Sequence, residues 1–312
     1  MDTNEKYILS VLFKLKVYKS TKQGYEDLFT DVMTLSNPNY RNPKPQGRLG
    51  DSKCDGFDGT TGKYYQIYAP EDLKGNEQTI TDKFTKSLKV IIEEWKEISP
   101  VKEFYIAVND KYEGIYNSTE QLPVNLKKTF GIDCSNFTSQ DLENLFYALD
   151  DDKKFQVLGG VIPNVESLST VINFEVLKES ILYIQNIECS YEVKALPQNI
   201  DLPAKIKFNK LNENIAEFIN VGSYQIANLD EYFKQNSNNK VILQKVFNNL
   251  YNEGLEIISD NEKHRSDIVF FYILEKACVD NRKAVKDAVL TLMSYYFGYC
   301  DIFEEPPRTT LF

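Results

Sequence analysis

The chain has 312 residues, of which 46 are acidic and 36 basic, so its formal net charge at pH 7 is −10. This length suits one large domain or two small ones. The acidic charge excludes binding of nucleic acid by unaided charge, because neutralisation of phosphates is the main source of that affinity. Any contact with nucleic acid therefore needs a bound cation, a local basic groove or a partner subunit.

Histidine and cysteine usage narrows the classes of chemistry further. The only histidine is His264, which excludes His-rich zinc sites and Ser-His-Asp catalysis, and its charged neighbours predict a surface position. Five cysteines without CxxC spacing are typical of free thiols in a reducing compartment. The N-terminus lacks a signal pattern and no apolar run is long enough to cross a bilayer, so we expect a cytoplasmic protein without membrane contact.

The N-terminal half alternates between helical and strand patterns. Apolar residues at helical spacing predict helices around residues 7–15 and 25–33, and the Pro- and Asn-rich stretch 37–50 predicts a loop. Asp-Gly-Thr-Thr-Gly at 58–62 has the chemistry of a hairpin turn. The order predicts an α/β domain over residues 1–160, with a mixed sheet flanked by helices. Its further predicted elements are strands at 54–57, 63–69 and 104–108, a helix at 80–95 and a helix capped by Thr138.

Helical periodicity dominates the C-terminal half. Gly159, Gly160 and Pro163 mark a plausible boundary, after which we expect a mainly α-helical domain over residues 161–312. The aromatic run 295–297 is expected to lie in the core or at a partner interface. The predicted apolar stripes contain Ile215, Phe218 and Ile219; Val241, Ile242, Val246, Phe247 and Leu250; Ile268, Phe271, Tyr272 and Leu274; and Val285, Val289, Leu292, Met293 and Tyr296.

Two carboxylates and a glutamine around the predicted hairpin are the candidate functional residues. Asp51 and Asp55 lie on a Gly-bracketed turn, and Gln66 lies in the middle of the aromatic return strand. Acids beside glycine also shape turns without further function, and Gln66 can be an outward-facing strand residue. The functional alternative is a Mg²⁺ site, because Mg²⁺ prefers one or two carboxylates together with substrate phosphate.

The pattern resembles the PD-(D/E)xK, or restriction-endonuclease-like, nucleases. The resemblance is carried by Glu26 on an early helix, by Gly-Asp-Ser-Lys-Cys-Asp-Gly-Phe at 50–57, and by Lys-Tyr-Tyr-Gln-Ile-Tyr-Ala-Pro-Glu at 63–71. The segments 104–111 and 295–304 are similar to proteins of ABC-three-component anti-phage defence systems, relatives of Lamassu effectors. In those systems an effector is joined to a helical C-terminal domain, which docks on an ABC/SMC-like ATPase and a small middle component.

The resemblance assigns roles to individual residues. Glu26 would be the helix acid, Asp55 the central metal ligand, Gln66 the second-strand ligand and Asp51 a supporting acid for Mg²⁺ or Mn²⁺. The family places a lysine two residues after the position of Gln66, where this chain has Tyr68, which carries no cation at neutral pH.

Another lysine would have to take the place of the family lysine. Lys83 and Lys86 lie on the following predicted helix, and Lys53 and Lys63 lie nearer in the sequence. A solvated surface position is an alternative for each of the four. We select Lys83 as the fourth catalytic residue.

The resemblance implies a metal-dependent DNA endonuclease, held inactive until an ABC/SMC-like ATPase partner senses foreign DNA. The alternative is a catalytically inactive scaffold or sensor subunit of the same complex, which keeps the nuclease fold without its lysine. A third candidate, a stand-alone nucleic-acid-binding module, would bind DNA with strong salt dependence.

Overall fold

The computed structural model describes residues 1–43, 54–70, 77–160, 162–165, 168, 173–189, 201–299 and 302–307. Its contacts group the chain into two compact units. The α/β unit is residues 16–158, and the helical unit combines residues 1–15 with residues 159–312. Helix α1 (Thr3–Lys19) therefore contributes residues to both units. The division into two domains at residue 160 stays a prediction.

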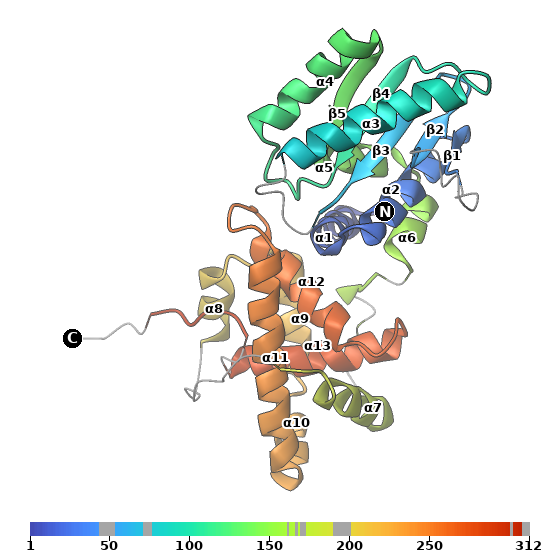
Figure 1. The fold of residues 1–312 in the computed structure, drawn as a ribbon. Helices are drawn as coiled ribbons and strands as arrows, with labels where there is room; N and C mark the ends of the chain where they lie inside the picture. The colour runs from blue at the N-terminus through green and yellow to red at the C-terminus, as the bar shows by residue number, and fades with distance from the viewer. Residues whose placement is uncertain are drawn as a thin grey trace. The chain divides into compact units, whose positions relative to one another are not determined.

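Among the described residues, a five-stranded mixed sheet forms the centre of the α/β unit (Figure 1). The strands follow one another across the sheet in chain order, with β1, β2 and β3 antiparallel and β3, β4 and β5 parallel. The sheet and its flanking helices, together with a helical C-terminal region, confirm the predicted fold class. The strands are β1 (Tyr40–Arg41), β2 (Gly56–Asp58), β3 (Lys63–Tyr68), β4 (Glu103–Val108) and β5 (Asp133–Phe137).

Helices cover both faces of this sheet. On one face, Tyr64 and Phe104 belong to an apolar core built with residues of α3 and α4. On the other face, α2 places the ring of Phe29 5.7 Å from the Tyr65 ring and 5.3 Å from the Phe137 ring. Neighbouring residues of a strand point to opposite faces, so the side of each β3 residue follows from these contacts. The helices of this unit are α2 (Gln23–Ser36), α3 (Glu77–Trp95), α4 (Asn117–Phe130), α5 (Ser139–Ala148) and α6 (Asp151–Leu158).

The predicted hairpin turn is confirmed, and Asp58 organises it. Its carboxylate accepts hydrogen bonds from the Thr60 amide at 2.9 Å, the Thr60 hydroxyl at 2.6 Å and the Asn37 side chain at 2.9 Å. Gly62 has a φ of 74°, and a Cβ at this position would lie 2.7 Å from the Pro100 carbonyl oxygen. The turn therefore needs both the acid and the glycine.

Seven helices make up the described helical part of the C-terminal half. The aromatic run 295–297 is fully buried, which places it in the core. The predicted stripes are largely confirmed as buried. The exceptions are Val241, which is half exposed, and Ile242, which is partly exposed, at the start of α11. The helices are α7 (Phe174–Gln185), α8 (Leu202–Phe208), α9 (Glu213–Ser223), α10 (Ile226–Gln235), α11 (Ser237–Ile257), α12 (Arg265–Ala277) and α13 (Lys283–Gly298).

The first part of α1 is held in the helical unit by polar contacts. The Tyr7 hydroxyl donates to the buried Asp267 carboxylate and lies 2.9 Å from Nδ1 of His264. The Lys14 ammonium pairs with Glu262 at 2.9 Å. The predicted surface position of His264 is therefore wrong in part, because its ring is packed edge-on against Tyr7.

Within the described residues, no helix is both long and apolar enough to cross a membrane.

Replacing Asp58 with Asn tests the turn through its pH dependence. Burial alone would raise the pKa of Asp58, but the hydrogen bonds from Thr60, Asn37 and Thr61 outweigh burial and hold the pKa below its usual 3.8. Ionised Asp58 therefore stabilises the fold above about pH 4, and this contribution is lost as the pH falls further. We expect D58N to lower the free energy of unfolding by about 1–3 kcal/mol at pH 7, and by progressively less below pH 4.

Urea unfolding at several pH values measures this difference, with D152N as the control at an exposed acid. A difference between wild type and D58N that does not change with pH would contradict the assignment.

Candidate functional site

Asp55 lies where the pairing of β2 with β3 ends. Its amide donates to the Tyr65 carbonyl oxygen at 3.2 Å. Its carboxylate oxygen Oδ2 then accepts the Ile67 amide at 2.6 Å and the side-chain amide of Gln66. The carboxylate thus takes the place of a backbone carbonyl at the edge of β3. The structure brings Asp55 and Gln66 together, as the sequence predicts for these two residues.

Gln66 is buried and oriented by this contact. The side chain is 4% exposed and leaves β3 on the face that carries Tyr64, which is the face covered by α3 and α4. Its Nε2 donates to Asp55, whereas none of the described residues donates a hydrogen bond to its buried carbonyl oxygen Oε1. A buried polar atom without a partner costs about 1–3 kcal/mol, so this oxygen is suited to a ligand, a cation or a water molecule.

Lys83 reaches the same strand from α3. Its ammonium donates to the Ile67 carbonyl oxygen at 3.0 Å and lies 5.1 Å from the centre of the Tyr68 ring. The backbone of Ile67 thus donates its N–H to Asp55 and accepts a hydrogen bond from Lys83 at its C=O. An ammonium from the helix therefore lies beside Tyr68, the position at which the resemblance leads us to expect a lysine.

Tyr68 itself does not supply a charge. Burial raises its pKa above the usual 10.0, so the phenol stays neutral at physiological pH. Among the other lysines considered, Lys63 pairs with Glu103 at 3.4 Å and Lys86 is exposed. Lys53 lies outside the described residues.

Glu26 lies at the same end of β3, on a different helix. It is in the first turn of α2, and the Lys22 amide just before this helix donates to the Ala69 carbonyl oxygen at 2.7 Å. The body of α2 packs on the Tyr65 face, whereas Gln66 leaves the strand on the opposite face. Convergence of Glu26 on Asp55 stays a prediction, and Asp51 lies outside the described residues.

The Ile67 peptide is the part of the site that the sequence did not indicate. Its amide and carbonyl bind Asp55 and Lys83, yet an isoleucine inside an aromatic strand carries no chemical signal of its own. The described residues contain no group of three or more His, Cys, Asp or Glu side chains arranged for a metal ion. The candidate donor set is therefore one carboxylate and one amide oxygen.

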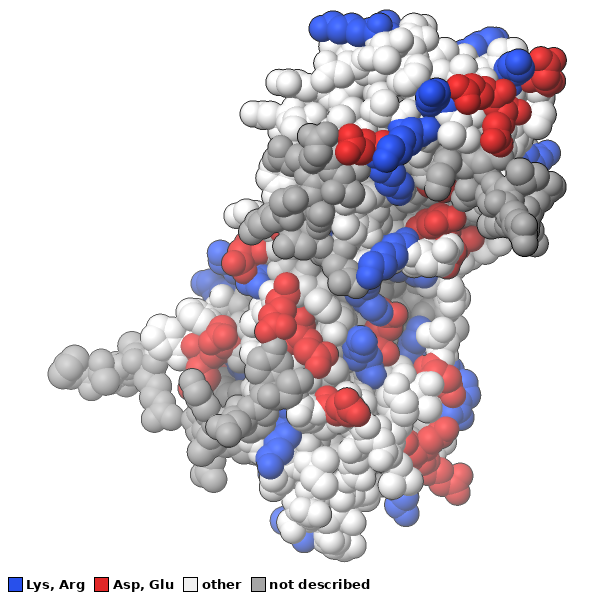
Figure 2. Space-filling view, in the orientation of Figure 1, with Lys and Arg blue, Asp and Glu red and all other residues white. Residues whose placement is uncertain are grey.

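The charge on the face drawn in Figure 2 gives little indication of a nucleic-acid groove. On the face drawn in Figure 2, Lys and Arg side chains are interspersed with Asp and Glu side chains. Mixed charge of this kind does not build the single-sign potential that attracts a phosphate backbone.

Replacing Gln66 with Glu tests the contact with Asp55. A second carboxylate here removes the Nε2 donor and places like charges together, so we expect Q66E to lower the free energy of unfolding at pH 7 by about 2 kcal/mol or more. The loss should diminish as the pH falls toward about 4, because protonation of one carboxyl restores a donor.

Thermal and urea unfolding measure this effect, with Q121E as the matched control on the exposed surface of α4. Equal stability of Q66E and Q121E at pH 7 would show that the Gln66–Asp55 contact is not formed.

Comparison with known proteins gives a match for the C-terminal part of the chain. No curated protein and no solved structure matches the chain. The matched segment, residues 186–304, contains α8 to α13 and is less than half of the chain. It matches the family model of C-terminal domain 10 of the ABC-three component (ABC-3C) systems, and this supports membership of the chain in such a system.

Proposed function

We propose that this chain is the effector subunit of an ABC-three-component anti-phage defence system. In this proposal the α/β unit hydrolyses DNA phosphodiester bonds, and the helical unit docks on an ABC/SMC-like ATPase and a small middle component. The match of residues 186–304 supports the system, and the residues around Ile67 support the activity.

One observation carries the proposed activity. Asp55 and Lys83 both bind the backbone of Ile67, and the unpartnered Oε1 belongs to the preceding residue, Gln66. An acid, an oxygen acceptor and an ammonium in one place are the groups that hydrolysis of a phosphodiester requires. They come from the residue before β2, from β3 and from α3, so three consecutive elements between residues 55 and 83 bring them together.

The donor set fits a hard divalent cation. Mg²⁺ and Mn²⁺ take oxygen ligands, and Mg²⁺ commonly uses one or two carboxylates together with water and substrate phosphate. Asp55 and Oε1 of Gln66 would hold the cation, with Glu26 and Asp51 as further proposed ligands. When bound, the cation supplies positive charge for the phosphate and lowers the pKa of coordinated water.

The residues of the chain have separate roles in this proposal. Asp55 holds its position through the Ile67 amide, and Gln66 is oriented by donating to Asp55. Lys83, whose ammonium donates to the Ile67 carbonyl oxygen, would donate to a phosphate oxygen of the substrate. Electrostatic stabilisation of the charge that develops on phosphorus is commonly the largest contribution of such a group. Neutral Tyr68 provides the ring over which this ammonium lies.

A second candidate function rests on the same contacts. The Asp55 carboxylate completes the hydrogen bonding of the β3 edge, which is a structural role in its own right. This favours an inactive scaffold or sensor subunit that keeps Asp55 for folding alone. The two candidates make opposite predictions for DNA cleavage by the wild-type protein, because a structural role of Asp55 requires neither a cation nor the Lys83 ammonium.

Plasmid cleavage with Mg²⁺ or Mn²⁺, in the presence of the ATPase subunit of the same system, tests the proposed function. D55N keeps an acceptor for the Ile67 amide but removes the charge, and we expect it to abolish cleavage. K83M should lower the rate roughly a hundredfold, whereas K86M, one turn further along α3, should stay within about twofold.

Thermal unfolding of each variant separates lost activity from lost folding. Intact DNA with wild-type protein under every activating condition would favour the scaffold, whereas equal cleavage rates for K83M and K86M would exclude the proposed role of Lys83.

A further inference from the structure

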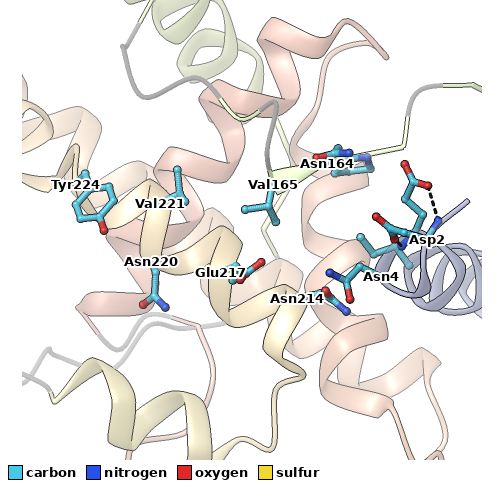
Figure 3. Close-up of a pocket in the computed structure, with 12 residues that line it drawn as sticks. Asp2, Asn4, Asn164, Val165, Asn214, Glu217, Asn220, Val221 and Tyr224 are labelled. Carbon is cyan, nitrogen blue, oxygen red and sulfur yellow. Dashed lines mark hydrogen bonds between the residues drawn. The ribbon is translucent and has the colours of Figure 1, made fainter.

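A pocket of about 450 Å³ lies in the helical unit, which does not include the residues around Ile67 (Figure 3). Its wall is formed by the start of α1, by residues 163–165 and by one side of α9. This volume is within the range of sites that bind small ligands or single side chains. Neither the predicted sites nor the proposed cleavage accounts for the pocket.

The charge of the lining is one-sided. Asp2, Glu5 and Glu217 contribute carboxylates, and the described lining contains no Lys or Arg. Glu217 forms no ion pair among the described residues, and in Figure 3 it lies on α9 next to Asn214. The start of a helix favours anions, but the Asp2 and Glu5 carboxylates already accept each other's backbone amides at 2.8 and 3.1 Å. The pocket therefore favours a cation.

Asn214 adds an oriented acceptor to the wall. The residue is only 8% exposed, and its Nδ2 donates to the Asn212 side chain at 2.9 Å. This contact fixes the orientation of the amide and leaves Oδ1 without a hydrogen-bond donor among the described residues. A fixed acceptor inside a carboxylate-lined pocket suits an ammonium or guanidinium group, which can donate several hydrogen bonds.

The mouth of the pocket has the character of a protein interface. Glu217 and Asn220 are exposed, and Tyr224 beside them is 74% exposed. An exposed tyrosine can stack on a guanidinium and is enriched where proteins bind one another. An open pocket covers little of a free small cation, whereas a peptide can continue along the surface beyond the mouth.

We propose that this pocket binds a basic side chain of an extended peptide segment from a partner protein, with Glu217 and Asn214 as the central contacts and Tyr224 at the rim. Charge complementarity selects the occupant: the carboxylates repel nucleic acid and acidic peptides and attract Lys or Arg. The proposal goes beyond DNA cleavage and does not depend on Asp55 or Lys83.

Fluorescence anisotropy with the full chain and a fluorescein-labelled hexa-arginine peptide tests the proposal at about 0.15 M salt, where the Debye length is about 8 Å. We expect E217Q to weaken binding about five- to tenfold and Y224A to weaken it by a similar factor. E213Q is the matched control, since it removes the same charge from the same helix outside the pocket. A hexaglutamate peptide should not bind.

Three results would overturn the proposal. If E217Q and E213Q weakened binding of the peptide equally, the peptide would be attracted by the overall acidic charge of the protein and not by the pocket. No detectable binding to correctly folded wild-type protein would mean that the pocket does not take a basic peptide. Displacement by spermine with the same affinity and the same dependence on Glu217 would assign the pocket to a small polycation instead. Each result leaves the cleavage assay with D55N and K83M unaffected.

Discussion

The edge of β3 at Ile67 is the constraint on which the rest of the α/β unit depends. Regular pairing with β2 ends at Asp55, so the Ile67 amide needs another acceptor, and the Asp55 carboxylate provides it at 2.6 Å. This contact fixes the carboxylate, the carboxylate orients the Gln66 amide, and the orientation leaves Oε1 of Gln66 buried without a donor. A buried oxygen acceptor without a donor among the described residues thus follows from the completion of a strand edge.

The same edge also positions the Lys83 ammonium beside Tyr68. The Ile67 carbonyl oxygen, like the Ile67 amide, lies beyond the end of the pairing with β2, and it accepts a hydrogen bond from the Lys83 ammonium. The same ammonium lies over the Tyr68 ring. A lysine on the strand would start from the position of Tyr68. In the proposed site, Lys83 would instead place its ammonium near Tyr68 from α3, the helix that covers this face. The cation would then lie close to the same point but would be carried by a helix rather than by a strand.

Much of the fold could be predicted from the sequence, because several of its elements carry strong local sequence signals. The turn 58–62, strand β4 and the start of α5 at Thr138 follow from glycine placement, apolar runs and capping chemistry. Strand β5 was missed because Asp-Cys-Ser-Asn-Phe has no apolar alternation, and its pairing with β4 is what makes it a strand. Helix α4 was missed because Pro123 lies inside it.

The candidate site was also predictable only where the contacts are local in sequence. Pairing of Asp55 with Gln66 was predictable from hairpin spacing, whereas the contact of Lys83 with Ile67 depends on how α3 packs over the sheet. The pocket beside α9 was not predictable, because it joins the first residues of the chain to residues more than 200 positions later.

The central claim is that Oε1 of Gln66 and the Asp55 carboxylate form a cation site. Anomalous diffraction from crystals of the full chain grown with Mn²⁺ tests this claim most directly. The account predicts an anomalous peak within about 2.0–2.4 Å of both oxygens, the range for hard divalent cations bound by oxygen. An ordered water on Oε1 without anomalous signal, at a Mn²⁺ concentration that labels other carboxylates, would contradict it.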